Sequence, residues 1–184
     1  MTDVPEGTFS FGPDEGQLLV KVFREGVAAR VGHDLVFEAR RWTAKAAVGP
    51  SPSTSGLEAT VDVASLTVVD AVGGAKPLSR SDKGDIKRNI EEKILNARGF
   101  PTITFASTSV IWSSDSEVTL SGALSIMGKS RPVEMRMRIG GGRARGAFTV
   151  TQTGWGIKPF SALMGALKVR DAVEVSLDVA VPAA

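Results

Sequence analysis

From Glu117 to Ile139 the chain reads EVTLSGALSIMGKSRPVEMRMRI. Apolar residues or glycine occupy every second position on both sides of the central MGKSRP. This alternation is typical of strands that bury one face and leave the other in water. The central glycine and proline favour a connection over 128–132. The pattern predicts two antiparallel strands, 117–127 and 133–139.

The same period of two recurs along most of the chain and predicts an all-β fold. The other expected strands cover residues 7–11, 17–24, 34–39 continuing into 42–48, 57–64, 102–112, 143–152 and 172–181. We interpret 49–56 and 71–80, which are rich in Gly, Pro and Ser, as loops. Eight or nine strands suffice to close a sheet and remove its edges. The expected architecture is a single antiparallel eight-stranded lipocalin-like barrel, one domain over 1–184.

One segment departs from the strand pattern and predicts an amphipathic helix over about 82–96. Ile86, Ile90 and Ile94 repeat at a spacing of four, which places them on one helical face. Ser81 or Asp82 can cap the start, and Gly99 provides a stop. We expect this helix to pack against the barrel wall or to plug one end.

Composition and charge exclude several classes of function. The 184 residues carry a formal net charge of +2 and a sequence pI of about 9.1, without a clustered basic face, so nucleic-acid binding is not expected. With no cysteine and one histidine, neither a disulfide nor a metal site is expected. The N-terminus lacks the features of a signal peptide and no apolar stretch could span a bilayer, so we expect a cytoplasmic location.

His33 is the one candidate for chemistry. Next to Asp34 it could act as a general base or contact a ligand head group. Adjacent strand residues point to opposite faces, however, so a hydrogen-bonded histidine at a strand entrance is the simpler interpretation. No serine lies in a Gly-x-Ser-x-Gly motif. We therefore expect no enzymatic activity and no cofactor. An enzyme that acts on lipid-like substrates through His33 and Asp34 is the alternative.

Residues 154–167 read GWGIKPFSALMGAL and fit neither a strand nor a long helix. Phe160, Leu163, Met164 and Leu167 bring four large apolar side chains to a short turn near 157–167. This turn either closes one end of the core or forms a flexible apolar lid over a barrel mouth, where methionine adapts to varied shapes.

The expected inward positions suggest a binding site for an apolar molecule. Small groups such as Ala59 and Gly122 among them indicate room for something besides side chains. With His33 and the apolar turn, the candidate ligand-binding residues are Val22, His33, Phe37, Val61, Phe105, Leu124, Met135, Phe148, Phe160, Leu163, Met164 and Leu177. A non-enzymatic structural or partner-binding barrel with a filled core is the alternative.

Two segments resemble a known family. Residues 100–108, FPTITFAST, are similar to the "yPtitF.St" strand of the YceI-like, lipocalin-like proteins, and residues 121–133, SGALSIMGKSRPV, to their "G.Lt.hGvtkpV" hairpin. The preceding helix also has its counterpart there. Residues 79–86 match the family's "rD.hL" pattern only loosely, and 32–34 and 157–169 depart from it.

The resemblance implies an extended barrel whose interior holds a long isoprenoid or fatty chain. The departures leave open whether the ligand is an isoprenoid quinone, a polyprenyl compound or a fatty chain. By analogy, the resemblance also implies a homodimer. Many family members are periplasmic or secreted, whereas this sequence shows no leader.

Overall fold

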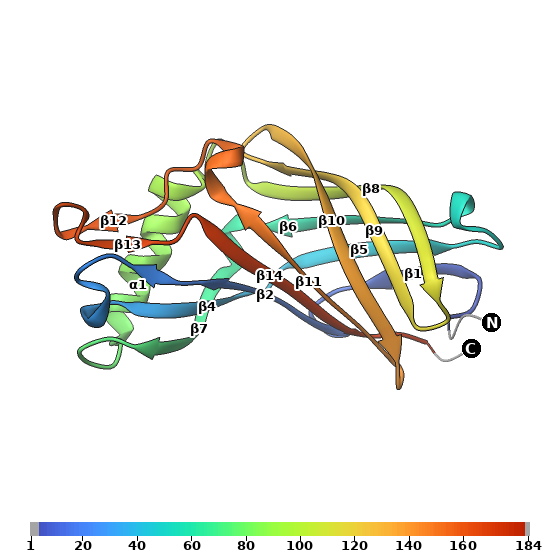
Figure 1. The fold of residues 1–184 in the computed structure, drawn as a ribbon, viewed down its shortest axis with the longest axis horizontal. Helices are drawn as coiled ribbons and strands as arrows, with labels where there is room; N and C mark the ends of the chain where they lie inside the picture. The colour runs from blue at the N-terminus through green and yellow to red at the C-terminus, as the bar shows by residue number, and fades with distance from the viewer. Residues whose placement is uncertain (1–3, 183–184) are drawn as a thin grey trace.

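The computed structural model describes residues 4–182, which form a strongly curled antiparallel sheet and one helix (Figure 1). The strands are β1 (Gly7–Phe11), β2 (Gly16–Val22), β3 (Arg24–Glu25), β4 (His33–Ala39), β5 (Trp42–Val48), β6 (Gly56–Asp62), β7 (Leu66–Gly73), β8 (Thr102–Ser114), β9 (Glu117–Ile126), β10 (Lys129–Gly140), β11 (Arg143–Thr151), β12 (Ser161–Ala162), β13 (Leu167–Val169) and β14 (Ala172–Ala180). The helix is α1 (Arg80–Arg88), continued by η4 (Asn89–Ile94). The predicted all-β, antiparallel fold is confirmed.

The main sheet has eleven strands within residues 4–182, in the order β1-β5-β6-β8-β9-β10-β11-β14-β2-β4-β7. The predicted count of eight is not confirmed. Three long segments, 7–22, 33–48 and 56–73, each contain two strands that run in the same direction around a break. At the break between β4 and β5 both neighbouring strands change, from β2 and β7 to β1 and β6.

The break between β4 and β5 links distant parts of the strand order. Only Arg40 and Arg41 separate these two strands along the chain. The Arg40 amide donates to the Ser65 carbonyl at 3.3 Å, and the Asp62 amide donates to the Arg41 carbonyl at 3.0 Å. The sheet therefore curls far enough for the chain itself to connect its two sides.

The hairpin of β9 and β10 confirms the alternation that predicted it. Val118, Leu120, Leu124 and Ile126 are buried, while the intervening side chains are not. The connection is shorter than predicted, because Ile126 already pairs with Lys129. Both turn residues, Met127 and Gly128, have positive φ, as a two-residue hairpin turn requires. The predicted connection over 128–132 was wrong. Methionine seldom adopts a positive φ, so nothing in the sequence indicated that Met127 belongs to the turn.

Strand β7 occupies part of the segment predicted as a loop over 71–80. Its partner β4 shifts register between Val36 and Phe37, so that Phe37 pairs with Val68 and Val36 with Asp70. Val69 is the extra residue of this bulge, and it breaks the period of two. Because the alternation is interrupted at Val69, the sequence pattern did not predict this strand.

The helix is confirmed, with shifted ends. Ser79 caps it, since its hydroxyl accepts from the Asp82 amide while the Asp82 carboxylate accepts from the Ser79 amide. It ends at Ile94, before the predicted residue 96, because Asn96 adopts the left-handed conformation in place of Gly99. Within residues 4–182, no helix has the length and apolar character needed to cross a bilayer.

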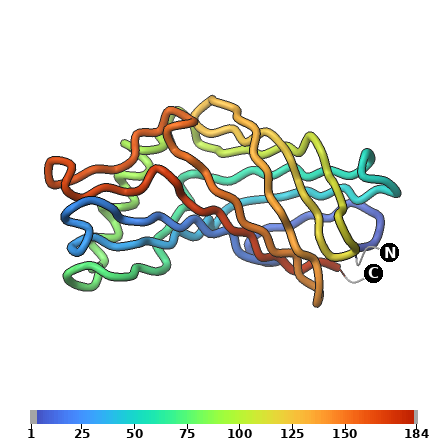
Figure 2. Tube along the Cα trace, viewed as in Figure 1, coloured from blue at the N-terminus to red at the C-terminus, as the bar shows by residue number. Residues whose placement is uncertain are grey.

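The termini and the helix lie at opposite ends of the elongated molecule (Figure 2). Beside the helix, three loops extend together. They connect β3 to β4, β7 to α1 and β12 to β13, and the last belongs to a small sheet of order β12-β13-β3.

Gly122 allows a close approach inside the sheet. A Cβ atom there would lie 2.5 Å from the Phe105 ring and 2.5 Å from the Ala106 carbonyl oxygen. We expect Gly122→Ala to lower the free energy of unfolding by about 1–3 kcal/mol, as overpacking does. Gly140→Ala in the same sheet is the control, because a Cβ atom at this position would have no neighbouring atom within 4 Å. Equal stability of both variants in urea denaturation would contradict this account.

Candidate ligand-binding site

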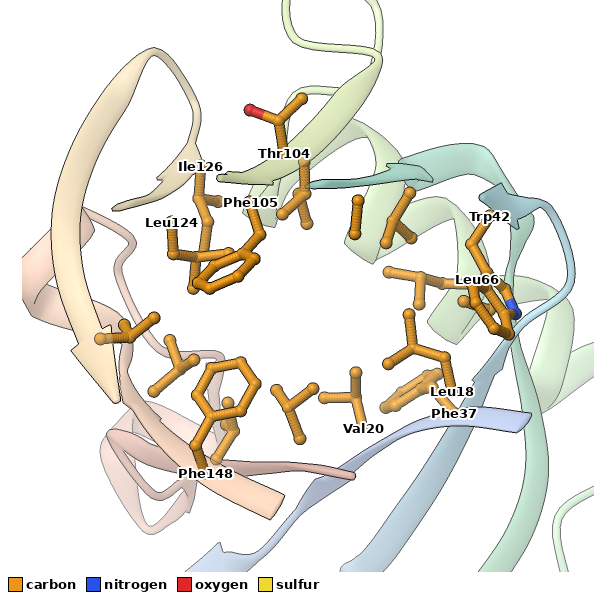
Figure 3. Close-up of a pocket in the computed structure, with 18 of the residues that line it drawn as sticks. Leu18, Val20, Phe37, Trp42, Leu66, Thr104, Phe105, Leu124, Ile126 and Phe148 are labelled. Atoms are coloured by element: carbon orange, nitrogen blue, oxygen red, sulfur yellow. The ribbon is translucent and has the colours of Figure 1, made fainter. Parts of the chain in front are cut away.

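An apolar cavity of about 220 Å³ lies inside the curled sheet. Figure 3 shows side chains from facing parts of the sheet, among them Val20, Phe37, Phe105 and Phe148, around an open centre. Strands β2, β4 and β5 contribute to one side, and β8, β9, β10 and β11 to the other. The alternation of each strand therefore turns its apolar members toward one common space.

Two further cavities adjoin this central one. A cavity of about 100 Å³ shares Trp42, Ala44, Leu57 and Leu177 with it. A cavity of about 580 Å³ shares Val22, Phe37, Ile90, Ile94 and Gln152 with it. We call the three the deep, central and mouth cavities, in the order of about 100, 220 and 580 Å³. They follow one another along the interior, separated by shared side chains.

The helix forms the boundary between the central and mouth cavities. Ile90 and Ile94 line both, Leu95 lines the central cavity and Ile86 lines the mouth cavity. These are the residues of the predicted apolar stripe. Their burial on the sheet side stabilises the helix and supplies an apolar wall at the same time.

Polar groups are scarce around the central cavity. Thr104 directs its hydroxyl away from the open centre in Figure 3. Gln152 donates from Nε2 to the Arg170 carbonyl at 2.9 Å. Trp42 Nε1 is the only buried side-chain nitrogen or oxygen without a hydrogen-bond partner among residues 4–182. An interior of this kind favours hydrocarbon over any molecule that must hydrogen-bond along its length.

The mouth cavity has a charged rim. The charged residues Arg24, Lys76, Asp82, Asp85 and Lys168 line it, together with His33 and apolar residues. The Ser79 amide and hydroxyl hold the pKa of Asp82 below its ordinary value of 3.8, so this carboxylate is ionised at neutral pH. The wall thus changes from apolar inside to charged at the mouth, which suits an amphiphile with its polar end outward.

Arg24 joins the loops around the mouth. Its Nη1 donates to the carbonyls of Gly32 at 2.7 Å and Val72 at 3.1 Å, and its backbone amide donates to Asp34 Oδ1 at 2.8 Å. Gly73 permits this arrangement, since a Cβ there would lie 1.6 Å from Arg24 Nη1. One guanidinium therefore connects β3, the start of β4 and the end of β7.

His33 and Asp34 have different partners. His33 Nε2 lies 2.8 Å from the Lys76 carbonyl oxygen, and Gly74 lets that loop lie against the imidazole, because a Cβ atom there would be 2.1 Å from Nε2. His33 lines the mouth cavity, whereas Asp34 accepts from Arg24. In this geometry the imidazole ties the β7–α1 loop to the start of β4.

A comparison with known protein families identifies the fold. The sequence profile of the YceI-like domain matches residues 24–181. The chain belongs to the YceI-like family. This confirms the resemblance noted in residues 100–108 and 121–133.

Solved structures share the fold of this YceI-like protein. The chain is similar to Burkholderia cenocepacia BcnA, with a TM-score of 0.67 and 14% identity over 91% of this chain and 96% of that one. It is also similar to a Campylobacter jejuni YCEI protein, with a TM-score of 0.57 and 14% identity over 76% of this chain and 80% of that one. No curated protein sequence matches it. At this identity the structural likeness concerns the fold alone.

Most residues selected from the sequence lie along the three cavities of this YceI-like protein. The structure places in the walls of the central cavity Val22, Phe37, Val61, Phe105, Leu124, Met135, Phe148 and Leu177. His33 and Phe160 line the mouth cavity. Leu18 and Val20 also line the central cavity and were not predicted, although they continue the face of Val22 at a spacing of two. The helix residues were not among the predicted ligand-binding residues either, although the helix was expected to pack against the barrel wall or to plug one end.

Leu163 and Met164 lie elsewhere. Leu163 is 60% exposed, Met164 is fully exposed, and neither lines any of the three cavities. The β12–β13 hairpin pairs with β3 and points away from the interior, so the predicted apolar lid contributes only Phe160 and Leu167 to the mouth. Likewise, Gly122 leaves no free room, because the Phe105 ring occupies the space beside it.

His33→Ala tests the role of the imidazole in holding the mouth loops. Loss of one hydrogen bond, worth about 0.5–1.5 kcal/mol, should speed amide exchange in residues 73–77 by about two- to tenfold. Hydrogen–deuterium exchange measures this, with β9 amides as the internal control. Unchanged exchange at 73–77 would show that His33 does not hold this loop.

Proposed function

We propose that this YceI-like protein binds one long apolar molecule along its interior and catalyses no reaction. The ligand class is an isoprenoid quinone, a polyprenyl compound or a fatty chain. Its tail lies in the central and deep cavities, and its polar end lies in the mouth cavity.

The observation that carries this proposal is the succession of three cavities along one interior. The mouth cavity, about 580 Å³, is of the size found for small-molecule sites, about 300–1,000 Å³. The two inner cavities are smaller, about 220 and 100 Å³, and lined by apolar residues, which suits the hydrocarbon tail of such a ligand. Apolar cavities of this kind stay dry and take up apolar ligands.

Burial of hydrocarbon supplies the main favourable contribution to the binding free energy. About ten methylene equivalents contribute on the order of 8 kcal/mol when they leave water. Part of this gain offsets the ordering of the chain and of the mouth loops. The remainder is smaller than the about 8.2 kcal/mol of a 1 μM dissociation constant, so ten buried methylenes alone give binding weaker than micromolar, and a longer buried tail binds more tightly.

The absence of catalysis in the proposal rests on the partners of His33 and Asp34. Both groups hold loops together, and they do not meet at a common point of the mouth cavity. An enzyme working through His33 would lose turnover of lipid-like substrates in His33→Ala while still binding them. We expect instead that His33→Ala and wild type bind the same ligands and that neither turns them over.

Organic extraction of the purified protein, followed by mass spectrometry, tests the binding proposal. Val20→Trp is the decisive variant, because Val20 faces the central cavity in Figure 3. Leu19→Trp is the matched control, since the adjacent strand residue points to the opposite face. We expect Val20→Trp to retain at least about tenfold less lipid, the equivalent of 1.4 kcal/mol or more, and Leu19→Trp to retain as much as wild type.

Two results would count against the proposal. One is the absence of stoichiometric lipid together with no uptake of added polyprenyl or fatty chains. The other is equal retention by Val20→Trp and Leu19→Trp in correctly folded proteins. Both would favour the alternative of a structural or partner-binding protein with a filled core.

Ala44 offers a test of chain length. It is buried and lines both the central and the deep cavity. A larger side chain there should separate the deep cavity from the ligand. Each methylene kept out costs about 0.8 kcal/mol, so Ala44→Leu should weaken binding of the longest chains by about tenfold or more and leave short chains within about twofold. Titration with fatty acids of increasing length measures this, and a uniform loss at all lengths would contradict it.

A further inference from the structure

The end of the molecule beside the mouth cavity exposes apolar side chains. We call residues 24–33 and 158–170 the tip; they comprise β3, η1 (Ala29–Val31), β12, η6 (Leu163–Gly165) and β13. Val27 is 95% exposed, Leu163 60% and Met164 fully. Val31 and Phe160 are exposed less completely. These side chains belong to two loops joined by the pairing of β13 with β3, so they form one apolar surface.

The backbone presents these side chains outward. Leu163 and Met164 both have positive φ, 52° and 53°, which non-glycine residues seldom adopt. Gly165 follows with φ 88°. A turn that needed only to reverse the chain would favour Gly or Asn at these positions. Here the left-handed turn carries two large apolar side chains instead.

The tip is also strongly basic. It contains the cations Arg24, Arg30, Lys158, Lys168 and Arg170 and one carboxylate, Glu25, so its net charge is +4 while that of the whole chain is +2. Asp34, one residue beyond the tip, pairs with Arg24 at 3.9 Å. The other four cations are exposed. Along the chain these cations belong to the same two segments as the exposed apolar residues, and Glu25 is the one carboxylate within 24–33 and 158–170. Asp171, one residue beyond the tip, accepts from the amide and hydroxyl of Thr153.

We propose that the tip docks onto the surface of an anionic lipid bilayer. Apolar side chains between cations are the combination that binds the interface of such a membrane, the former among the acyl chains and the latter at the head groups. A second copy of the chain is a poorer occupant, because two tips of charge +4 repel each other. The apolar residues also stand on projecting loops, seen beyond the helix in Figure 1, rather than on a flat face.

The tip lies directly beside the entrance of the mouth cavity. Val31, Phe160, Leu167 and Lys168 belong to the tip and also line the mouth cavity. A bilayer in contact with the tip would therefore face the entrance to the interior. This use of the tip rests on the proposed function, since an apolar ligand could pass between bilayer and cavity without crossing water. The docking itself requires no ligand.

Vesicle flotation tests the proposal with the full chain. The probes are vesicles of phosphatidylcholine alone and of an equal mixture of phosphatidylcholine and phosphatidylglycerol. We expect wild type to float with the mixed vesicles, and both Leu163→Asp/Met164→Asp and Arg30→Glu/Lys168→Glu to float at least about tenfold less, the equivalent of 1.4 kcal/mol. Raised salt should also weaken binding, since exposed charges are screened.

Two control variants make the same kinds of substitution at exposed residues outside the tip. Ile111→Asp places a carboxylate at an apolar residue 56% exposed on β8, and Lys45→Glu/Arg136→Glu reverses two exposed cations on β5 and β10. Both should float like wild type. The proposal is overturned if wild type does not bind mixed vesicles, or if the controls lose binding as much as the tip variants. Concentration-dependent dimerisation abolished by Leu163→Asp/Met164→Asp, without vesicle binding, would instead assign the tip to a second copy.

Vesicle binding and lipid retention test the docking and the cavity proposals separately. Val20→Trp, which blocks the central cavity, should bind vesicles like wild type. A protein that binds vesicles but takes up no lipid refutes the cavity proposal alone. A protein that retains lipid but does not bind vesicles refutes the docking proposal alone.

Discussion

The interior of this protein depends on one constraint: neighbouring residues of a strand point to opposite faces, and the sheet curls until its inner faces meet. The side chains of Val20, Phe37 and Phe148 then converge from strands that are distant in the sequence. Because the large rings lie against the wall instead of across the centre, the common space stays open (Figure 3). The helix can close this space only with apolar residues, which is why Ile90 and Ile94 belong to both the core and the cavity wall.

The breaks in the long strands make the curl possible. At the centre of one break, Asp62 accepts from Arg41 Nε at 2.8 Å and from the Ala64 amide at 2.9 Å. The hydrogen bond from Arg41 holds the pKa of Asp62 below its ordinary value of 3.8, so the bend has an ionised carboxylate at neutral pH. Lys87 of the helix donates to the Ala64 carbonyl at 2.6 Å. The bend that redirects two strands therefore also positions the helix across the interior.

Period two was sufficient to predict most strands and part of the wall of the central cavity, because both depend on local alternation. It failed where a non-local or conformational detail intervenes. The bulge at Val69 hid β7, and the positive φ of Met127 shortened a connection that looked longer. The apolar character of Leu163 and Met164 also led to a wrong prediction of their place. Both are exposed, because the pairing of β13 with β3 holds their loop away from the interior. Whether Gly122 offers room could not be predicted either, because that depends on which way the Phe105 ring lies.

The arrangement of charge at the mouth bears on how the site selects its ligand. Arg24 and His33 line the mouth cavity, yet Arg24 Nη1 already donates to the carbonyls of Gly32 and Val72, and His33 Nε2 lies against the Lys76 carbonyl. A head group that displaced these carbonyls would loosen the loops that form the mouth. The remaining cations, Lys76 and Lys168, are exposed and carry flexible point charges, which provide attraction without fixed geometry. Discrimination between ligands should therefore arise from the length and width of the tail, where the wall is apolar and closely packed, and far less from the identity of the head group.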